Sequence, residues 1–177
     1  AIFSQFGRCP VPELLDAGVT VGLGSDATAP DRSSDMFRHM FQATRYHRAI
    51  RQEPALLPPG RVMEMATVDA ANALGLGDRI GSLEPGKWAD LVVVDGAQPH
   101  LTPLTHPVHQ IVYFATGADV ATVIVGGEVL VAGGAATSLD VAEVLADGVR
   151  QQAEVIERCA LEDLLADRPG TWGETRY

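Results

Sequence analysis

Asp26 is the residue best placed to carry out chemistry. It ends the stretch Val19-Thr20-Val21-Gly22-Leu23-Gly24-Ser25-Asp26, which predicts a buried strand that delivers a carboxylate into a loop. A carboxylate there can bind a divalent cation and accept a proton from metal-bound water. The alternative is a turn aspartate that accepts hydrogen bonds from nearby backbone N–H groups. Spacing alone leaves both interpretations open.

The five histidines suggest a second kind of metal site. His39 and His47 are eight residues apart on one predicted helix, about 12 Å along its axis, which is too far to share a metal ion. We expect both on the helix surface. His100, His106 and His109 could converge on a metal, although two intervening prolines leave their backbone path open. HExxH, P-loop, GxSxG and zinc-finger spacings are absent.

Helices must position the Asp26 segment. A short helix is predicted over residues 12–17, with Gly18 just past its end. A second is predicted from Asp35 to about Arg51, capped by Ser33 or Ser34, and a third from about Arg61 to Leu74. Helix, glycine, apolar strand and a loop opening another helix are typical of a parallel α/β unit. In barrels of such units, functional residues lie at the C-terminal ends of strands, where Asp26 is expected.

The periodicity changes after Gly77. Short β-rich runs with tight turns predict a small β module, in which Gly126-Gly127 indicates a two-residue hairpin. The predicted strands are Trp88–Asp95, Val108–Ala115, Val120–Val125 and Glu128–Val131.

A long helix is predicted at the end of the chain. Thr137-Ser138-Leu139-Asp140 opens it, and Arg168-Pro169-Gly170 ends it. The expected organisation is therefore a barrel segment over residues 1–79, part of a β domain over 80–137, and a helix with a tail over 138–177.

Composition limits the classes of partner. The formal net charge is −10, from 13 basic and 23 acidic residues, and no basic face is evident, which argues against nucleic acid or an anionic membrane. No apolar run approaches the ~20 residues that span a bilayer, and no signal peptide is evident. Cys9 and Cys159 form neither a disulfide framework nor a CxxC site, which favours a reduced, cytoplasmic setting.

Several stretches in fixed order resemble the amidohydrolase superfamily, in its cytosine-deaminase-like and chlorohydrolase-like branch. The similarity covers roughly residues 8–160, and the run from Ile80 to Asp95 is its most specific part. The matching stretches are Leu14–Asp26, Asp35-Met36-Phe37, Met65-Ala66-Thr67, Ala73–Leu76, Ile80–Asp95 and Val123–Val129.

The resemblance implies a fold and a chemistry. The expected fold is α/β, the C-terminal part of a (β/α)8 TIM-type barrel with part of a small β-sandwich and a C-terminal helix. Family members use one divalent metal, most often zinc and sometimes iron, to activate water against C–N or C–Cl bonds of heterocycles. The resemblance implies that Asp26 ends the eighth strand, contacts the metal site and takes a proton from the attacking water.

The other ligands of the family have no counterpart in this chain. They are an HxH pair after the first strand and histidines after the fifth and sixth strands, and a glutamate on the fifth strand helps to protonate the ring. We therefore expect the chain to correspond to the C-terminal two-fifths of such an enzyme. We expect it to be inactive alone, because one carboxylate does not hold a catalytic zinc, and to self-associate through open barrel edges.

Two alternatives to the deaminase prediction stay open. One is a dechlorinating hydrolase on the same scaffold. The other is a non-catalytic assembly module that uses the β part and the long helix as an interface. In either enzymatic case the expected partners are a small heterocyclic substrate and further copies of the chain.

Overall fold

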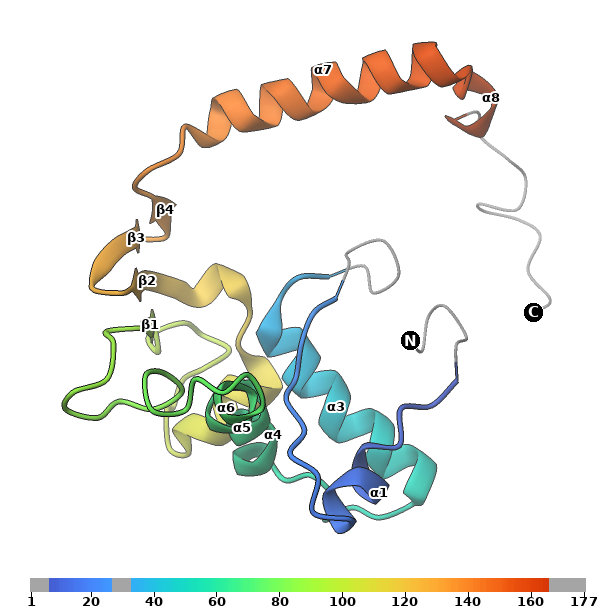
Figure 1. The fold of residues 1–177 in the computed structure, drawn as a ribbon. Coiled ribbons are helices and arrows are strands. Elements are labelled where there is room, and N and C mark those ends of the chain that lie inside the picture. The colour runs from blue at the N-terminus through green and yellow to red at the C-terminus, as the bar shows by residue number, and fades with distance from the viewer. Residues whose placement is uncertain (1–6, 27–32, 166–177) are drawn as a thin grey trace. The chain divides into compact units, whose positions relative to one another are not determined.

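The computed structural model describes residues 7–26 and 33–165. It divides into two compact units, Ala1–Thr137 and Ser138–Tyr177, which are described separately below (Figure 1).

The first unit is built around helices that pack on one another. Its described α-helices are α1 (Val11–Asp16), α3 (Met36–Arg51), α4 (Pro59–Ala66), α5 (Val68–Ala73) and α6 (Pro107–Phe114). Helices α3, α4 and α6 contact one another pairwise, and α5 follows directly on α4 (Figure 1).

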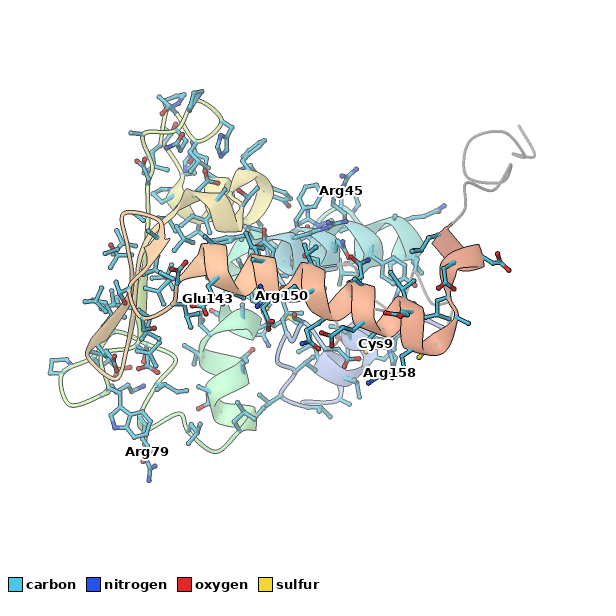
Figure 2. The ribbon with its side chains drawn as sticks, turned by 90° about the horizontal axis from the view of Figure 1, so that it is seen from above. Cys9, Arg45, Arg79, Glu143, Arg150 and Arg158 are labelled. Carbon is cyan, nitrogen blue, oxygen red and sulfur yellow. The ribbon has the colours of Figure 1, made fainter. Side chains whose placement is uncertain are left out.

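Helix α3 confirms the second predicted helix. Its N-cap is Asp35, whose carboxylate accepts a hydrogen bond from the Phe37 backbone N–H at 2.9 Å. Its C-cap is Gln52 in the left-handed conformation. Arg45 extends from the exposed side of the helix (Figure 2), and its guanidinium lies 4.9 Å from the centre of the Phe41 ring.

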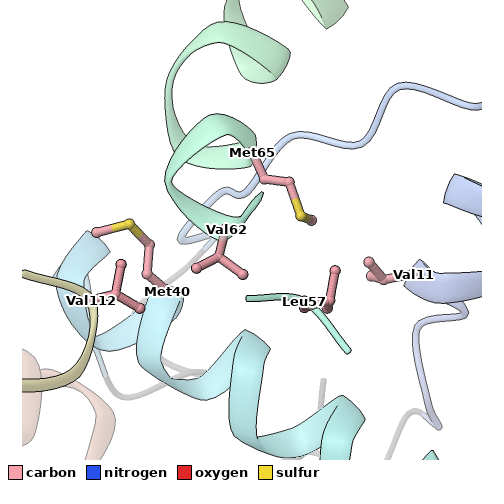
Figure 3. Packing of buried hydrophobic residues seen from close by; sticks show 6 residues of the cluster. All are labelled: Val11, Met40, Leu57, Val62, Met65 and Val112. Atoms are coloured by element: carbon pink, nitrogen blue, oxygen red, sulfur yellow. The ribbon is translucent and has the colours of Figure 1, made fainter. Parts of the chain in front are cut away.

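The core of the first unit lies between these helices. Val62 and Met65 of α4 are completely buried and point toward side chains from the neighbouring elements (Figure 3). The buried cluster consists of Val11, Met40, Leu57, Val62, Met65 and Val112. The cluster joins residues that are up to 101 positions apart in the sequence, from Val11 to Val112, so it holds the unit together.

The prediction of a single helix from about Arg61 to Leu74 is wrong in one respect, because this stretch forms two helices, α4 and α5. Thr67 separates α4 from α5 with φ −130° and ψ −90°, far from helical values. Its hydroxyl donates to the Met63 carbonyl at 2.7 Å, which offers a local alternative to helical hydrogen bonding.

The sheet of the first unit is antiparallel throughout, in the order β1-β2-β3-β4. Its strands are β1 (Leu91–Val94), β2 (Val120–Val125), β3 (Glu128–Ala132) and β4 (Ala135–Ala136). Gly126 and Gly127 join β2 to β3 with φ of 58° and 86°, which confirms the predicted two-residue hairpin.

The strand predicted over Val108–Ala115 is wrong, because these residues lie in α6. Pro107 occupies the first turn, where a missing N–H group costs nothing. Val112 is 1% exposed and joins the core beside α3 and α4. Short apolar runs look alike in helices and strands, and here burial against two helices decides the outcome.

The second unit consists of α7 (Val141–Cys159) and α8 (Glu162–Leu165). Asp140 caps α7 by accepting a hydrogen bond from the Glu143 backbone N–H at 3.1 Å. The predicted end of this helix at residues 168–170 is wrong, because Ala160 adopts a left-handed conformation and stops α7 at Cys159. Residues 166–177 lie outside the described part of the chain. Within the described residues, no helix has the length and apolar character needed to cross a membrane.

Candidate functional site

The segment from Val19 to Asp26 forms neither a helix nor a strand and pairs with none of the described strands. The predicted strand is therefore not formed as part of a sheet within the described residues. Two contacts fix the segment instead. The Leu23 N–H donates to the Met65 carbonyl at 2.8 Å, and a Cβ added to Gly22 would lie 2.9 Å from the Ala70 Cα. Only glycine allows the segment to approach α5 this closely.

Asp26 ends this segment with its side chain exposed. Its φ is 52°, in the left-handed region that aspartate tolerates better than most residues. Residues 27–32, which belong to the following loop, lie outside the described part of the chain.

Asp35 connects the far side of that loop to the rest of the unit. Its backbone N–H donates to the Ser33 hydroxyl at 3.1 Å, and Ser33 is 9% exposed. One oxygen of the Asp35 carboxylate caps α3. The other accepts a hydrogen bond from the Gly117 N–H at 3.0 Å, at the start of the 3-10 turn η1 (Gly117–Asp119). The residues on both sides of the loop after Asp26 are thus held by hydrogen bonds from distant parts of the chain.

The histidines at 100, 106 and 109 do not converge on one point. The His100 Nε2 lies 3.0 Å from a carboxylate oxygen of Asp119. His106 precedes α6 and donates its backbone N–H to Gln110 at 2.9 Å. The His109 ring packs on Tyr113 with ring centres 4.5 Å apart. Each histidine therefore has its own local structural role.

Asp119 is a buried carboxylate that the sequence did not single out. It is 5% exposed and accepts hydrogen bonds from the Thr116 N–H at 2.7 Å and from the Thr116 hydroxyl at 3.1 Å. Burial raises the pKa of Asp119, but the hydrogen bonds from His100 and Thr116 outweigh it and hold the pKa below its usual value. Asp119 thus anchors the turn before β2 as a charged group.

His39 and His47 are buried, at 7% and 5% exposed, so the prediction that both lie on the helix surface is wrong. The inward face of α3 contains Met40 and Thr44, and the next position at helical spacing is His47. Extending the predicted apolar face by one turn would have found it. The exposed positions of the helix are occupied mainly by arginines such as Arg45.

Both buried histidines line a cavity of about 250 Å³, together with Gly7, Cys9, Val11 and residues 21–24. The His47 Nδ1 atom is buried and has no hydrogen-bond partner among the described residues. Burial lowers the pKa of His47, the positive charges of Arg8 and Arg51 lower it further, and Glu13 opposes them. Asp26 does not line this cavity.

The described residues do not make a complete metal centre. They contain no group of three or more histidine, cysteine, aspartate or glutamate side chains arranged to hold a metal ion. A catalytic zinc typically takes three protein ligands. A metal that Asp26 helps to bind therefore needs further ligands from outside the described residues.

Comparison with known proteins identifies the family. Residues 4–130 match the family model described as the amidohydrolase family. The chain therefore belongs to the amidohydrolase family, and the resemblance seen in its sequence motifs is confirmed.

Two relatives of similar sequence are named as deaminases. The chain is 38% identical over 151 residues to a 5-methylthioadenosine/S-adenosylhomocysteine deaminase of Syntrophobacter fumaroxidans, a match that covers 85% of this chain and 34% of the relative. It is 42% identical over 140 residues to the protein of the same name from Moorella thermoacetica, covering 79% and 33%. The chain spans about a third of the length of these relatives.

Solved structures agree with this assignment. An adenosine deaminase from Xanthomonas campestris with bound zinc matches with a TM-score of 0.81 and 32% identity, over 84% of this chain and 34% of that chain. An atrazine chlorohydrolase from Arthrobacter aurescens complexed with zinc matches with a TM-score of 0.73 and 26% identity, over 82% and 32%. The chain thus has the α/β fold of one portion of an amidohydrolase.

Proposed function

We propose that this chain forms part of a metal-dependent amidohydrolase that deaminates an aminated heterocycle, of the purine nucleoside type, with Asp26 as a catalytic residue. The observation that carries the proposal is the geometry of Asp26. Its carboxylate stands exposed at the end of a segment that Gly22 and Leu23 fix against the helices. The relatives named as deaminases of adenosine-type nucleosides supply the substrate class.

Asp26 supplies a base and a metal contact in this proposal. A bound divalent metal, with zinc first because structural neighbours carry it, would supply the Lewis acid that makes water nucleophilic. Asp26 would help to hold this metal and would accept a proton from the attacking water. The left-handed turn at Asp26 keeps the carboxylate at the end of the segment rather than in a backbone ladder.

Dechlorination on the same scaffold is the second candidate, because triazine hydrolases are among the structural neighbours. Their identity to this chain is 26%, compared with 32% for the adenosine deaminase and up to 42% for the nucleoside deaminases. The nucleoside substrate is favoured on this basis. The third candidate, an assembly module without catalysis, requires that Asp26 be dispensable.

The test combines this chain with the rest of an amidohydrolase. A chimera replaces the aligned third of the Moorella thermoacetica relative with residues 1–177, and its release of ammonia from 5′-methylthioadenosine is compared with its release of chloride from a chlorinated triazine. The chimera should deaminate the nucleoside. Asp26→Asn should lower kcat by about 10²–10⁴-fold, because it removes the proton acceptor while asparagine still tolerates the left-handed conformation.

Asp16→Asn is the matched control, because Asp16 is an exposed carboxylate at the end of α1. It should leave turnover unchanged. The 177-residue chain alone should show no turnover. A folded chimera that acts on neither substrate, or an Asp26→Asn chimera with full activity, would overturn the proposal and favour an assembly role.

We also propose a cytoplasmic setting and assembly into a homo-oligomer. The support for the first is that Cys9 and Cys159 are both free thiols. The support for the second is that large apolar side chains of the first unit, such as Leu74 and Leu83, are exposed.

A further inference from the structure

The segment that ends at Asp26 makes a close contact with α5, between Gly22 and Ala70. A Cβ added to Gly22 would lie 2.9 Å from the Ala70 Cα and 3.1 Å from the Ala70 Cβ, whereas ordinary van der Waals contact is 3.4–4 Å. The Ala70 Cα is a backbone atom and cannot rotate away. A larger side chain on either residue must therefore push the segment and α5 apart by about half an ångström or more.

Helix α5 is held in place from a second face. A Cβ added to Gly81, which precedes the sheet, would lie 2.7 Å from the Ala71 Cβ and 3.2 Å from the Thr67 carbonyl oxygen. Ala71 itself is 3% exposed. The chain before β1 thus packs directly on α5, and the helix has little room to retreat from the segment.

The segment is the less constrained partner of the contact. Its Leu23 N–H donates to the Met65 carbonyl at 2.8 Å, which ties the segment to the end of α4. A Cβ added to Gly24, one residue further on, would meet no described atom within 4 Å. A larger residue at the contact with α5 should therefore displace the segment rather than the helix.

Asp26 lies on the same side of the segment as Gly22. Exposure alternates along residues 21–26, where Val21, Leu23 and Ser25 are half-buried and Gly22, Gly24 and Asp26 are exposed. Alternation with a period of two puts Gly22 and Asp26 on one side of the backbone. A push on Gly22 is therefore directed toward the side from which the Asp26 carboxylate is exposed.

We propose that Ala70 is a positioning residue for the Asp26 carboxylate and acts through its contact with Gly22. The proposal rests on the proposed function of Asp26. The small side chain of Ala70 sets how closely the segment approaches α5, and the position of the segment sets the position of the carboxylate at its end. The contact matters for turnover because a misplacement of about 1 Å can lower a rate by ~10²-fold.

Kinetics of the chimera described above test this role. Ala70→Val should lower kcat by about 10–100-fold and leave KM within about twofold, because Asp26 acts on the attacking water in the transition state. Gly22→Ala enlarges the other side of the same contact and should have the same effect. Ala73→Val is the matched control, since it makes the same change at an exposed position of the same helix. It should leave kcat within about twofold of the parent.

A second background separates positioning from a general loss of structure. Asp26→Asn removes the group that Ala70 positions, so adding Ala70→Val to it should lower kcat by less than about twofold further. A purely structural role of Ala70 would lower kcat by the same factor in both backgrounds. Equal factors would overturn the proposal, and so would an Ala70→Val chimera with the kcat of the parent.

Hydrogen exchange tests the displacement without the reaction. The Leu23 amide should exchange about tenfold faster in Ala70→Val and in Gly22→Ala, because its hydrogen bond to Met65 is strained, and at the parent rate in Ala73→Val. Mass spectrometry that resolves single amides provides the measurement. An unchanged rate in both Ala70→Val and Gly22→Ala would overturn the proposal.

The two proposals fail in different ways. A folded parent chimera without turnover refutes the proposed function and, with it, this role of Ala70. A chimera whose turnover depends on Asp26 but is insensitive to Ala70→Val and Gly22→Ala refutes the positioning role alone.

Discussion

Helices α3 and α7 are built alike at their ends but differ in what they bury. Each has an aspartate N-cap, Asp35 or Asp140, whose carboxylate accepts a backbone N–H from the first turn. Each stops at a residue in the left-handed conformation. Yet α3 buries four residues, including His39 and His47, while α7 buries none.

The difference shows that local sequence sets where a helix begins and ends, whereas its partner decides which side chains become core. Helix α3 finds its partners, α4 and α6, within the first unit. Helix α7 buries none of its residues within the second unit.

The largest expected difference in the loss of unfolding free energy is between substitution of a core methionine and substitution of an exposed leucine. Met65→Ala should lower the free energy of unfolding by about 2–5 kcal/mol, because Met65 is 0% exposed and its loss leaves a cavity. Leu145→Ala should change it by less than about 0.5 kcal/mol in dilute solution, because Leu145 is 66% exposed. Urea unfolding of both variants at low protein concentration provides the measurement.

A large loss for Leu145→Ala in dilute solution would contradict the comparison. It would mean that α7 packs against its own chain, as α3 does.

Much of the first unit could be predicted from residue types alone. Asp35 as a cap and Gly126-Gly127 as a hairpin each follow from a local chemical requirement. The family motifs also predicted the fold that the comparisons confirm. The cap and the hairpin depend only on residues close together in the sequence, and the fold was predicted from motifs that the family shares.

The failures concern residues whose state depends on distant partners. Residues 108–115 form a helix because Val112 packs beside α3 and α4. His47 is buried because its face of α3 meets the segment at residues 21–24. The sequence of that segment predicts a strand. A β-strand must hydrogen-bond to a neighbouring strand, however, and no described strand pairs with the segment. The role of Asp26 stays a prediction for the same reason, since the described residues contain no group of side chains that could hold a metal ion with it.

A smaller difference is expected between the two N-caps. Asp140→Ala should cost about 1 kcal/mol of helix stability, the usual value for an N-cap. Asp35→Ala should cost about 2 kcal/mol, because its second carboxylate oxygen also accepts the Gly117 N–H. Thermal unfolding followed by circular dichroism compares the two.

Asp35→Asn separates the two roles of Asp35. Asparagine caps a helix as well as aspartate does, but its amide nitrogen cannot accept the hydrogen bond from Gly117. The loss of stability in Asp35→Asn should therefore equal the difference between the losses in Asp35→Ala and Asp140→Ala. Equal losses in both alanine variants would show that the Gly117 contact adds nothing to stability.

The smallest effect is expected at His47, and it depends on pH. Burial and the charges of Arg8 and Arg51 lower the pKa of His47 from its ordinary value of 6.5, against the opposing charge of Glu13. The unfolded chain therefore takes up this proton at a higher pH than the folded chain does. The contribution of neutral His47 to the free energy of unfolding should be fully present above pH 6.5. It should be lost as the pH falls through 6.5 toward the pKa of His47 in the folded chain.

His47→Gln removes this titration while keeping a polar group at the cavity wall. The variant should show a flatter dependence of stability on pH below 6.5 than the parent chain, and the two should differ little in slope at pH 8. Urea unfolding at a series of pH values measures both curves. Parallel curves would mean that His47 titrates alike in the folded and unfolded chains, so that the inner face of α3 is open to water as α7 is.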